Sequence, residues 1–157
     1  MLEIKVPGWR TLRLEYLVMD LNGTLAVDGI PRPGVTEALR SLRSRLHPLL
    51  LTADTHGTAQ RVAQELGVTL HRLEPGDQVA QKRAIVRDLG ADRVVAMGNG
   101  ANDAGMLAEA ALAIVVMGEE GAARQALLEA DVIVRDPLEG LALLQHPRRL
   151  VATLRRA

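Results

Sequence analysis

Short apolar runs alternate with amphipathic stretches along the whole chain. Runs such as Leu17-Val18-Met19 and Ile114-Val115-Val116 are continuously apolar and do not alternate with polar residues. Continuous runs are typical of strands covered on both faces, as in a parallel sheet that lies between helices. We therefore predict six core strands, over residues 14–19, 48–52, 68–71, 93–97, 112–117 and 131–134.

The stretches between these runs have the periodicity of helices. Gly67 and Gly90 each follow such a stretch and precede a strand, which suits a glycine at a helix C-terminus. Asp54 or Thr55 is placed to cap the second helix. We predict helices over residues 35–46, 58–66, 77–89, 103–110, 122–129 and 138–144. The alternation of strand and helix predicts an α/β fold with a Rossmann-like parallel sheet sandwiched by helices.

The two ends of the chain follow other patterns. Residues 3–6 alternate, Pro7-Gly8 is typical of a turn, and residues 11–14 continue into the first core strand. This pattern predicts an N-terminal β-hairpin at one edge of the sheet. Residues 147–157 carry four arginines among spaced apolar residues and predict a short basic helix.

Composition narrows the classes of function. The length of 157 residues favours a single domain, residues 1–157. The 19 basic and 19 acidic side chains balance, so the chain has no general attraction to a polyanion. Trp9 and Tyr16 are the only aromatic residues, too few for a platform that stacks nucleic-acid bases. The absence of cysteine excludes thiol chemistry. We expect no nucleic-acid partner.

Membrane and targeting signals are not apparent in the sequence. The first nine residues lack the apolar core of a signal peptide. The longest apolar runs are about six residues, far short of the ~20 that span a bilayer. We therefore expect a cytoplasmic protein without a membrane partner.

Candidate chemistry first appears in Met19-Asp20-Leu21-Asn22-Gly23-Thr24. Asp20 ends an apolar strand, and ligands of open α/β sheets bind outside the carboxyl ends of the strands. A carboxylate there serves as a nucleophile or a metal ligand. Alternatively, Asp20 or Asn22 merely caps a turn. These six residues alone leave both interpretations open.

Three later features favour the chemical interpretation. Thr52 ends the second core strand with a hydroxyl, and Gly98-Asn99-Gly100-Ala101-Asn102-Asp103 follows the fourth in a glycine-rich turn. Lys82 is one of only two lysines in a chain with 17 arginines. Phosphate handling needs such parts: a nucleophile, a hydroxyl donor, a cation and an oxygen-rich magnesium site. The histidines show no metal-ligand spacing; only His56, just past Thr52, lies near these features.

The order of these motifs resembles that of the haloacid dehalogenase-like (HAD) superfamily. The resemblance covers roughly residues 14–135, and within the superfamily the sequence most resembles the phosphorylation domain of P-type ATPases. Much of this likeness lies in residues 98–107, and residues 113–118 and 130–134 extend it. The resemblance implies a stand-alone, soluble relative of that domain and not an ion pump.

The resemblance also implies roles for individual residues. Asp20 would attack phosphorus and form an aspartyl-phosphate, while Thr52 and Lys82 would hold the transferring oxygens. Gly23 and Thr24, in the turn after the first core strand, would contact the phosphoryl group. Asn102, in the loop after the fourth core strand, would contact it as well.

A Mg²⁺ cofactor is implied by the same resemblance. Its ligands would be Asp20, the backbone carbonyl of Asn22, and Asp103. Asn99 would lie beside the metal, where the family usually has an aspartate, so one negative charge is lost and Mg²⁺ binding should be weaker.

Asn22 is a second departure from the family pattern. Family phosphatases have an aspartate there, which acts as general acid and base. An asparagine cannot exchange a proton near neutral pH. Loss of general acid–base catalysis lowers the reaction rate by ~10²–10⁴-fold. P-type ATPases also lack a carboxylate at this place. We therefore expect phosphorylation with slow hydrolysis.

The spacing of the motifs leaves no room for a cap domain. Only 27 residues, 25–51, separate the first two motifs, enough for a flap over residues 26–34 and one helix. Capless relatives act on large substrates or cover the site with a neighbouring subunit, so a homo-oligomer is plausible.

Two functions are consistent with this sequence. The first is a Mg²⁺-dependent phosphohydrolase acting on a phosphorylated substrate through Asp20. The alternative is a weakly active or inactive phosphate-binding module with a regulatory or assembly role. Asn22 and Asn99 favour the alternative, whereas the joint presence of four residues favours the enzyme: Asp20, Thr52, Lys82 and Asp103.

Overall fold

A six-stranded parallel sheet forms the centre of the computed structural model, which describes residues 1–54 and 57–157. The strand order is β10-β9-β8-β3-β6-β7, and every neighbouring pair is parallel. The strands are β3 (Tyr16–Asp20), β6 (His47–Thr52), β7 (Thr69–Arg72), β8 (Val94–Gly98), β9 (Leu112–Val116) and β10 (Val132–Val134). The predicted α/β class and its six core strands are confirmed.

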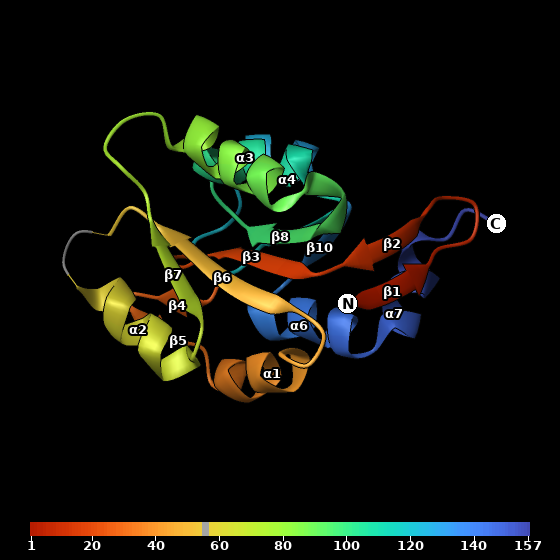
Figure 1. The fold of residues 1–157 in the computed structure, drawn as a ribbon, viewed down its shortest axis with the longest axis horizontal. Helices are drawn as coiled ribbons and strands as arrows, with labels where there is room; N and C mark the ends of the chain where they lie inside the picture. The colour runs from red at the N-terminus through yellow and green to blue at the C-terminus, as the bar shows by residue number, and fades with distance from the viewer. Residues whose placement is uncertain (55–56) are drawn as a thin grey trace.

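Helices cover both faces of this sheet (Figure 1). One face carries α3 (Gln78–Leu89), α4 (Ala104–Glu109) and α5 (Arg124–Leu128), and the other carries α1 (Val35–Leu42), α2 (Thr58–Leu66) and α6 (Pro137–Gln145). Successive strand residues point to opposite faces, so Leu17 and Met19 pack in one apolar cluster and Val18 in the other. Both faces are buried, which explains why the strands are continuously apolar.

The order of the strands reverses at β3. From β3 the chain proceeds outward to β6 and β7, and then returns to β8 on the opposite side of β3. The loops that leave β3 and β8 therefore diverge to opposite sides of the sheet. Such a reversal opens a crevice outside the carboxyl ends of the two strands, where ligands of α/β proteins bind.

The N-terminal hairpin is confirmed, but its predicted place at a sheet edge is wrong. Strands β1 (Leu2–Lys5) and β2 (Thr11–Leu14) form a separate two-stranded antiparallel sheet. Because β2 leads through Glu15 directly into the central strand β3, the hairpin extends from the middle of the main sheet.

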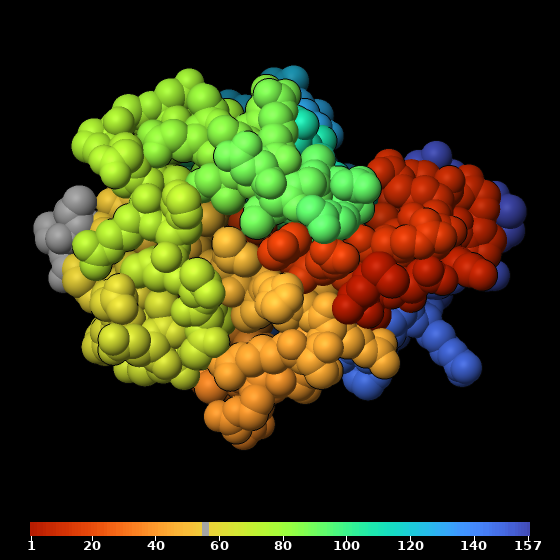
Figure 2. Space-filling model, in the orientation of Figure 1, coloured from red at the N-terminus to blue at the C-terminus, as the bar shows by residue number. Residues whose placement is uncertain are grey.

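The C-terminal helix α7 (Pro147–Leu154) packs beside this hairpin. Leu150 is buried, and the backbone N–H of Arg156 donates to Pro7 O at 2.9 Å. The C-terminal segment (blue) accordingly lies beside the N-terminal hairpin (red) in Figure 2. The basic terminal helix predicted from the sequence is confirmed.

Several helix ends also differ from prediction. Helix α1 ends at Leu42, not at residue 46, because the N–H groups of Arg45 and Leu46 both turn back to Leu42 O. Short 3₁₀ turns over Ala91–Arg93 and Ala101–Asp103 precede β8 and α4. The glycines expected to end α2 and α3 do so, with φ of 64° at Gly67 and 96° at Gly90.

The flap predicted over residues 26–34 is a small hairpin. Its strands are β4 (Ala26–Val27) and β5 (Ile30–Pro31), joined by a turn at Asp28 and Gly29. Between Asp20 and Thr52, this hairpin, α1 and their turns account for the chain, with no inserted cap. Among residues 1–54 and 57–157, no helix is both long and apolar enough to cross a membrane.

Candidate active site

Side chains from three neighbouring strands and one helix meet at the reversal point. Asp20 ends β3, Thr52 ends β6, the loop 99–103 follows β8, and Lys82 projects from α3. They border a cavity of about 380 Å³. Its lining residues are Asp20, Asn22, Thr52, Ala53, Asp54, Gln78, Lys82, Asn99, Gly100, Asn102 and Glu120.

Lys82 lies between two carboxylates. Its Nζ is 3.0 Å from Asp20 Oδ1 and 2.7 Å from Asp103 Oδ1. The exposed fractions of the three side chains are 1% for Lys82, 14% for Asp20 and 0% for Asp103. Only Asp20 among them therefore offers appreciable surface to a ligand.

Close packing of α3 on α4 places Lys82. A Cβ added at Gly105 in α4 would lie 2.7 Å from the backbone oxygen of Val79 in α3. The two helices therefore approach more closely than any larger residue at position 105 would allow. Asp77 caps the start of α3, because its Oδ1 accepts from Ala80 N at 3.0 Å.

The surroundings of this triad shift the pKa values of Asp20 and Lys82. Burial, reinforced by the neighbouring Asp103, raises the pKa of Asp20 to about 7, against the opposing effect of Lys82. Burial alone would lower the pKa of Lys82, but the two carboxylates outweigh it and raise that pKa. Two carboxylates share one ammonium group, which leaves the triad with excess negative charge when both are ionised.

Both carboxylate oxygens of Asp103 are engaged. Oδ1 accepts from Lys82, and Oδ2 accepts from the backbone N–H groups of Asn99 and Gly100 at 3.0 and 2.9 Å. Asp103 thereby holds both the lysine and the loop after β8, and it does not line the cavity. Its role as a direct metal ligand stays a prediction.

Asn99 connects three segments of the site. Thr24 Oγ1 donates to Asn99 Oδ1 at 3.3 Å, and Asn99 Nδ2 donates to Gly121 O at 3.3 Å. Beside it, Gly23 adopts a φ of +75°, and a Cβ there would lie 2.5 Å from Asn99 Nδ2. Gly23 is thus required both by its backbone conformation and by its neighbours.

Thr52 and Asp54 organise the loop after β6. Thr52 Oγ1 accepts from the N–H of Asp54 at 3.1 Å, so its hydroxyl proton can still be donated into the cavity. Asp54 Oδ2 accepts from Ala59 N at 2.8 Å and so satisfies a donor in the first turn of α2, although the N-cap residue is Gly57 and not Asp54. Thr55 and His56 lie outside the described residues.

Two cavity residues, Gln78 and Glu120, were not predicted from the sequence. Gln78 Oε1 accepts from Asn102 Nδ2 at 2.9 Å, and so α3 contacts the loop after β8. Glu120 follows β9 in a turn between Gly118 and Gly121. Its position beyond the carboxyl end of a core strand was the available signal.

The oxygen-rich lining fits Mg²⁺ better than a softer metal. Among residues 1–54 and 57–157, no three His, Cys, Asp or Glu side chains are grouped as a metal cluster. Mg²⁺ does not need such a cage, since it keeps several waters and uses one or two carboxylates plus substrate phosphate. The carboxylate of Asp20, the carbonyl of Asn22 and the amide oxygen of Asn99 are donors of the right chemistry.

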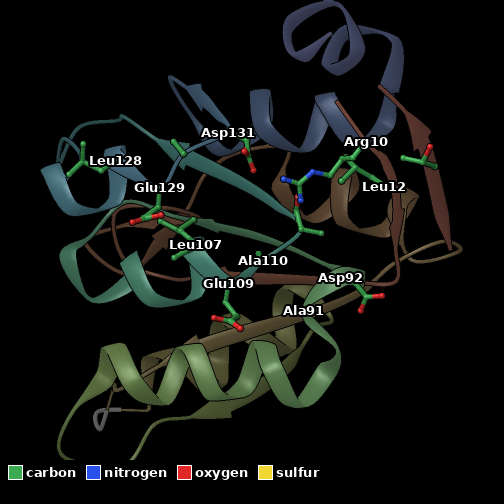
Figure 3. Close-up of a pocket in the computed structure, with 14 residues that line it drawn as sticks. Arg10, Leu12, Ala91, Asp92, Leu107, Glu109, Ala110, Leu128, Glu129 and Asp131 are labelled. Atoms are coloured by element: carbon green, nitrogen blue, oxygen red, sulfur yellow. The ribbon is translucent and has the colours of Figure 1, made fainter. Parts of the chain in front are cut away.

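A larger cavity of about 530 Å³ lies before the amino ends of β8, β9 and β10 (Figure 3). Its wall includes Arg10, whose Nη1 donates to Ala111 O, and Asp131, whose Oδ2 accepts from Ala113 N. None of the phosphate-motif residues lines it. Size alone therefore does not identify the functional site.

Comparisons with known proteins agree with this arrangement. The family model of haloacid dehalogenase-like hydrolases matches residues 2–111. An Arabidopsis thaliana protein, "Probable cadmium/zinc-transporting ATPase HMA1, chloroplastic", is 35% identical over 129 residues, covering 79% of this chain and 15% of that protein. "Probable cation-transporting P-type ATPase J" of Mycobacterium tuberculosis is 36% identical over 141 residues, covering 82% and 20%.

Among solved structures, the fold is similar to that of a phosphatase. The 3-deoxy-D-manno-octulosonate 8-phosphate phosphatase from Moraxella catarrhalis, in complex with a magnesium ion, phosphate and KDO, matches with a TM-score of 0.69. The two are 17% identical, and the match covers 90% of this chain and 94% of that one.

The chain spans only a fifth or less of the length of the two ATPases, and its likeness to the phosphatase concerns the fold. The family match, in contrast, covers more than half of the chain and includes Asp20, Thr52, Lys82 and Asp103. The sequence relatives also confirm the resemblance to P-type ATPases. The chain therefore belongs to the haloacid dehalogenase-like hydrolases.

Proposed function

We propose that this chain is a Mg²⁺-dependent phosphohydrolase that forms an aspartyl-phosphate on Asp20. The observation that carries the proposal is the contact of Lys82 Nζ with Asp20, which lines the cavity, and with the buried Asp103. A buried ammonium beside a partly exposed carboxylate suits attack on an anionic phosphoryl group.

In the first step, an Asp20 oxygen forms a bond to phosphorus while the bond from phosphorus to the leaving oxygen breaks. Lys82 and the Thr52 hydroxyl donate to the phosphoryl oxygens, and Asn102 and the Gly23–Thr24 turn position the group. Asp20, the backbone carbonyl of Asn22 and the side chain of Asn99 would hold Mg²⁺, which would supply neutralisation of phosphoryl charge. The ion pair with Asp103 holds the Lys82 ammonium in position.

In the second step, water attacks phosphorus, inorganic phosphate leaves, and the Asp20 carboxylate is restored. Asn22 can neither protonate the leaving oxygen nor accept the proton of the attacking water. Solvent must supply and remove these protons, which makes turnover slow by about 10²–10⁴-fold.

The substrate is a phosphorylated compound that reaches an uncapped cavity. Over the described part of the chain, the short β4–β5 hairpin is the segment inserted between Asp20 and α1. We propose that a bulky substrate or a second copy of the chain completes the cover.

A second candidate function is a phosphate-binding module with little or no turnover. The observation that favours it is the pair of amides at Asn22 and Asn99, where carboxylates would support catalysis and metal binding. In that case Asp20 and Lys82 bind phosphate, but the chain does not release product at a useful rate.

Hydrolysis of p-nitrophenyl phosphate with Mg²⁺ tests these functions. We expect slow hydrolysis by the unmodified chain, none by Asp20→Asn or in EDTA, and a higher rate for Asn22→Asp. Asp88→Asn is the matched control, because Asp88 is exposed on α3 outside the cavity. A rate unchanged by Asp20→Asn contradicts the enzyme. An inert chain that Asn22→Asp activates supports the binding module.

A further inference from the structure

Glu120 is an acidic residue of the site that the motifs did not indicate. It belongs to a tight turn, residues 118–121, closed by a bond from Gly121 N to Gly118 O at 2.9 Å. Glu120 lines the cavity with Asp20 and Asn22. The preceding Glu119 does not, since it pairs with Arg32 at 3.0 Å. Two successive glutamates therefore have different surroundings.

Asn99 fastens the turn that carries Glu120. Its Nδ2 donates to Gly121 O at 3.3 Å, and its backbone oxygen accepts from Ala123 N at 2.8 Å. An aspartate at position 99 has no side-chain N–H and would oppose the Gly121 carbonyl with a negative charge. The amide is thus the side chain that can hold this turn.

The Glu120 carboxylate and the Asn99 amide both lie beside Gly23. A Cβ built on Gly23 would lie 2.2 Å from Glu120 Oε2 and 2.5 Å from Asn99 Nδ2. Both atoms are therefore immediate neighbours of Gly23, which follows the Asn22 carbonyl proposed as a cation donor. The negative charge absent at position 99 is present on the adjacent side chain.

We propose that Glu120 supplies the cation site with the negative charge that Asn99 lacks, Asn99 acting as the clamp that holds the Glu120 turn. This inference rests on the proposed Mg²⁺-dependent function. Mg²⁺ keeps several of its waters when bound to protein. A carboxylate that accepts from those waters orients them and raises affinity, so Glu120 is a positioning residue for the metal.

Isothermal titration of the full chain with Mg²⁺ at constant ionic strength tests this role without requiring turnover. We expect Glu120→Gln to weaken Mg²⁺ affinity about 10-fold. Glu119→Gln removes the same charge one residue away and should stay within about twofold, because Glu119 pairs with Arg32 and does not line the cavity. Adding Asn99→Asp to Glu120→Gln should restore most of the affinity, because a carboxylate returns beside the cation.

Thermal unfolding in EDTA should be the same for Glu120→Gln and the unmodified chain, since Glu120 is exposed. Unchanged Mg²⁺ affinity in Glu120→Gln, equal losses in Glu119→Gln, or no recovery in the double variant overturns the inference. If p-nitrophenyl phosphate is hydrolysed with Mg²⁺ while Glu120→Gln binds Mg²⁺ normally, only this inference fails. If the unmodified chain neither binds Mg²⁺ nor hydrolyses the ester, the proposed function fails as well.

Discussion

At the residue scale, Lys82 has the most demanding environment in the site. Its ammonium group is almost hidden from solvent, and it is within 3.0 Å of two carboxylates. Such a group stabilises the fold mainly by neutralising the negative charges of its two carboxylate partners, because burial of an unpaired charge is costly. Although little exposed, Lys82 lines the cavity, where the proposed function has it donate to the phosphoryl group.

Replacing Lys82 by methionine should therefore harm stability as well as activity. Asp20 and Asp103 would face each other without a counter-charge, at a cost of about 3 kcal/mol in the free energy of unfolding. Urea denaturation in EDTA measures this cost. The control is Lys5→Met at the chain's other lysine, which is exposed in β1. Equal losses in the two variants would contradict the role of Lys82 in the buried triad.

How much of the site the sequence predicts depends on what places each residue. Asp20 and Thr52 end apolar strands, so their meeting follows from the geometry of a parallel sheet. Lys82 stands out as one of only two lysines, but its place in the site was predicted through the family resemblance, because nothing in its helix indicates which strand end it reaches. Glu120 and Gln78 were missed because their neighbours are set by tertiary contacts with the loop after β8.

At the element scale, the strand and helix order was predictable and the attachment of the hairpin was not. Continuous apolar runs identify buried strands, but alternation in residues 3–6 indicates only that a hairpin has one buried face. Glu15 separates β2 from β3, a break that the apolar pattern of residues 14–19 conceals. Helix boundaries such as the C-terminal end of α1 depend on the turns that come after the helix. Tertiary packing, and not the local apolar pattern, determines where those turns form.

The close contact of α3 with α4 is the element-scale feature that positions Lys82 at the cavity. Gly105→Ala should be destabilising even though alanine is favoured over glycine in helices by ~1 kcal/mol. The added Cβ would lie 2.7 Å from Val79 O, a backbone atom that cannot move alone. Overpacking of this kind costs about 1–3 kcal/mol and outweighs the gain in helix propensity.

We expect Gly105→Ala to lower both the urea midpoint and the rate of p-nitrophenyl phosphate hydrolysis, because α3 must shift with Lys82. Ala108→Ser is the control, since it also adds one heavy atom to α4 but at an exposed position outside the site cavity. Full activity with unchanged stability in Gly105→Ala would show that α3 does not depend on this close approach.

At the scale of the whole molecule, the reversal of strand order brings distant segments of the sequence to one crevice. Asp20, Lys82 and Asp103 are far apart in sequence but share a single ion-paired cluster. A ligand that engages Asp20 therefore couples β3, α3 and the loop after β8. Binding at this site should consequently be measurable as stability of the entire fold.

Beryllofluoride with Mg²⁺, a mimic of the phosphorylated aspartate, should accordingly raise the melting temperature. A ligand at about 100 times its Kd stabilises the folded state by about 2.7 kcal/mol. For a chain of this size, that corresponds to about 5–10 °C. Asp20→Asn should abolish the shift because it removes the attached oxygen, whereas Asn22→Asp should retain it because it leaves that oxygen in place. A shift that survives in Asp20→Asn, or that occurs equally in EDTA, would place the ligand somewhere other than on Asp20.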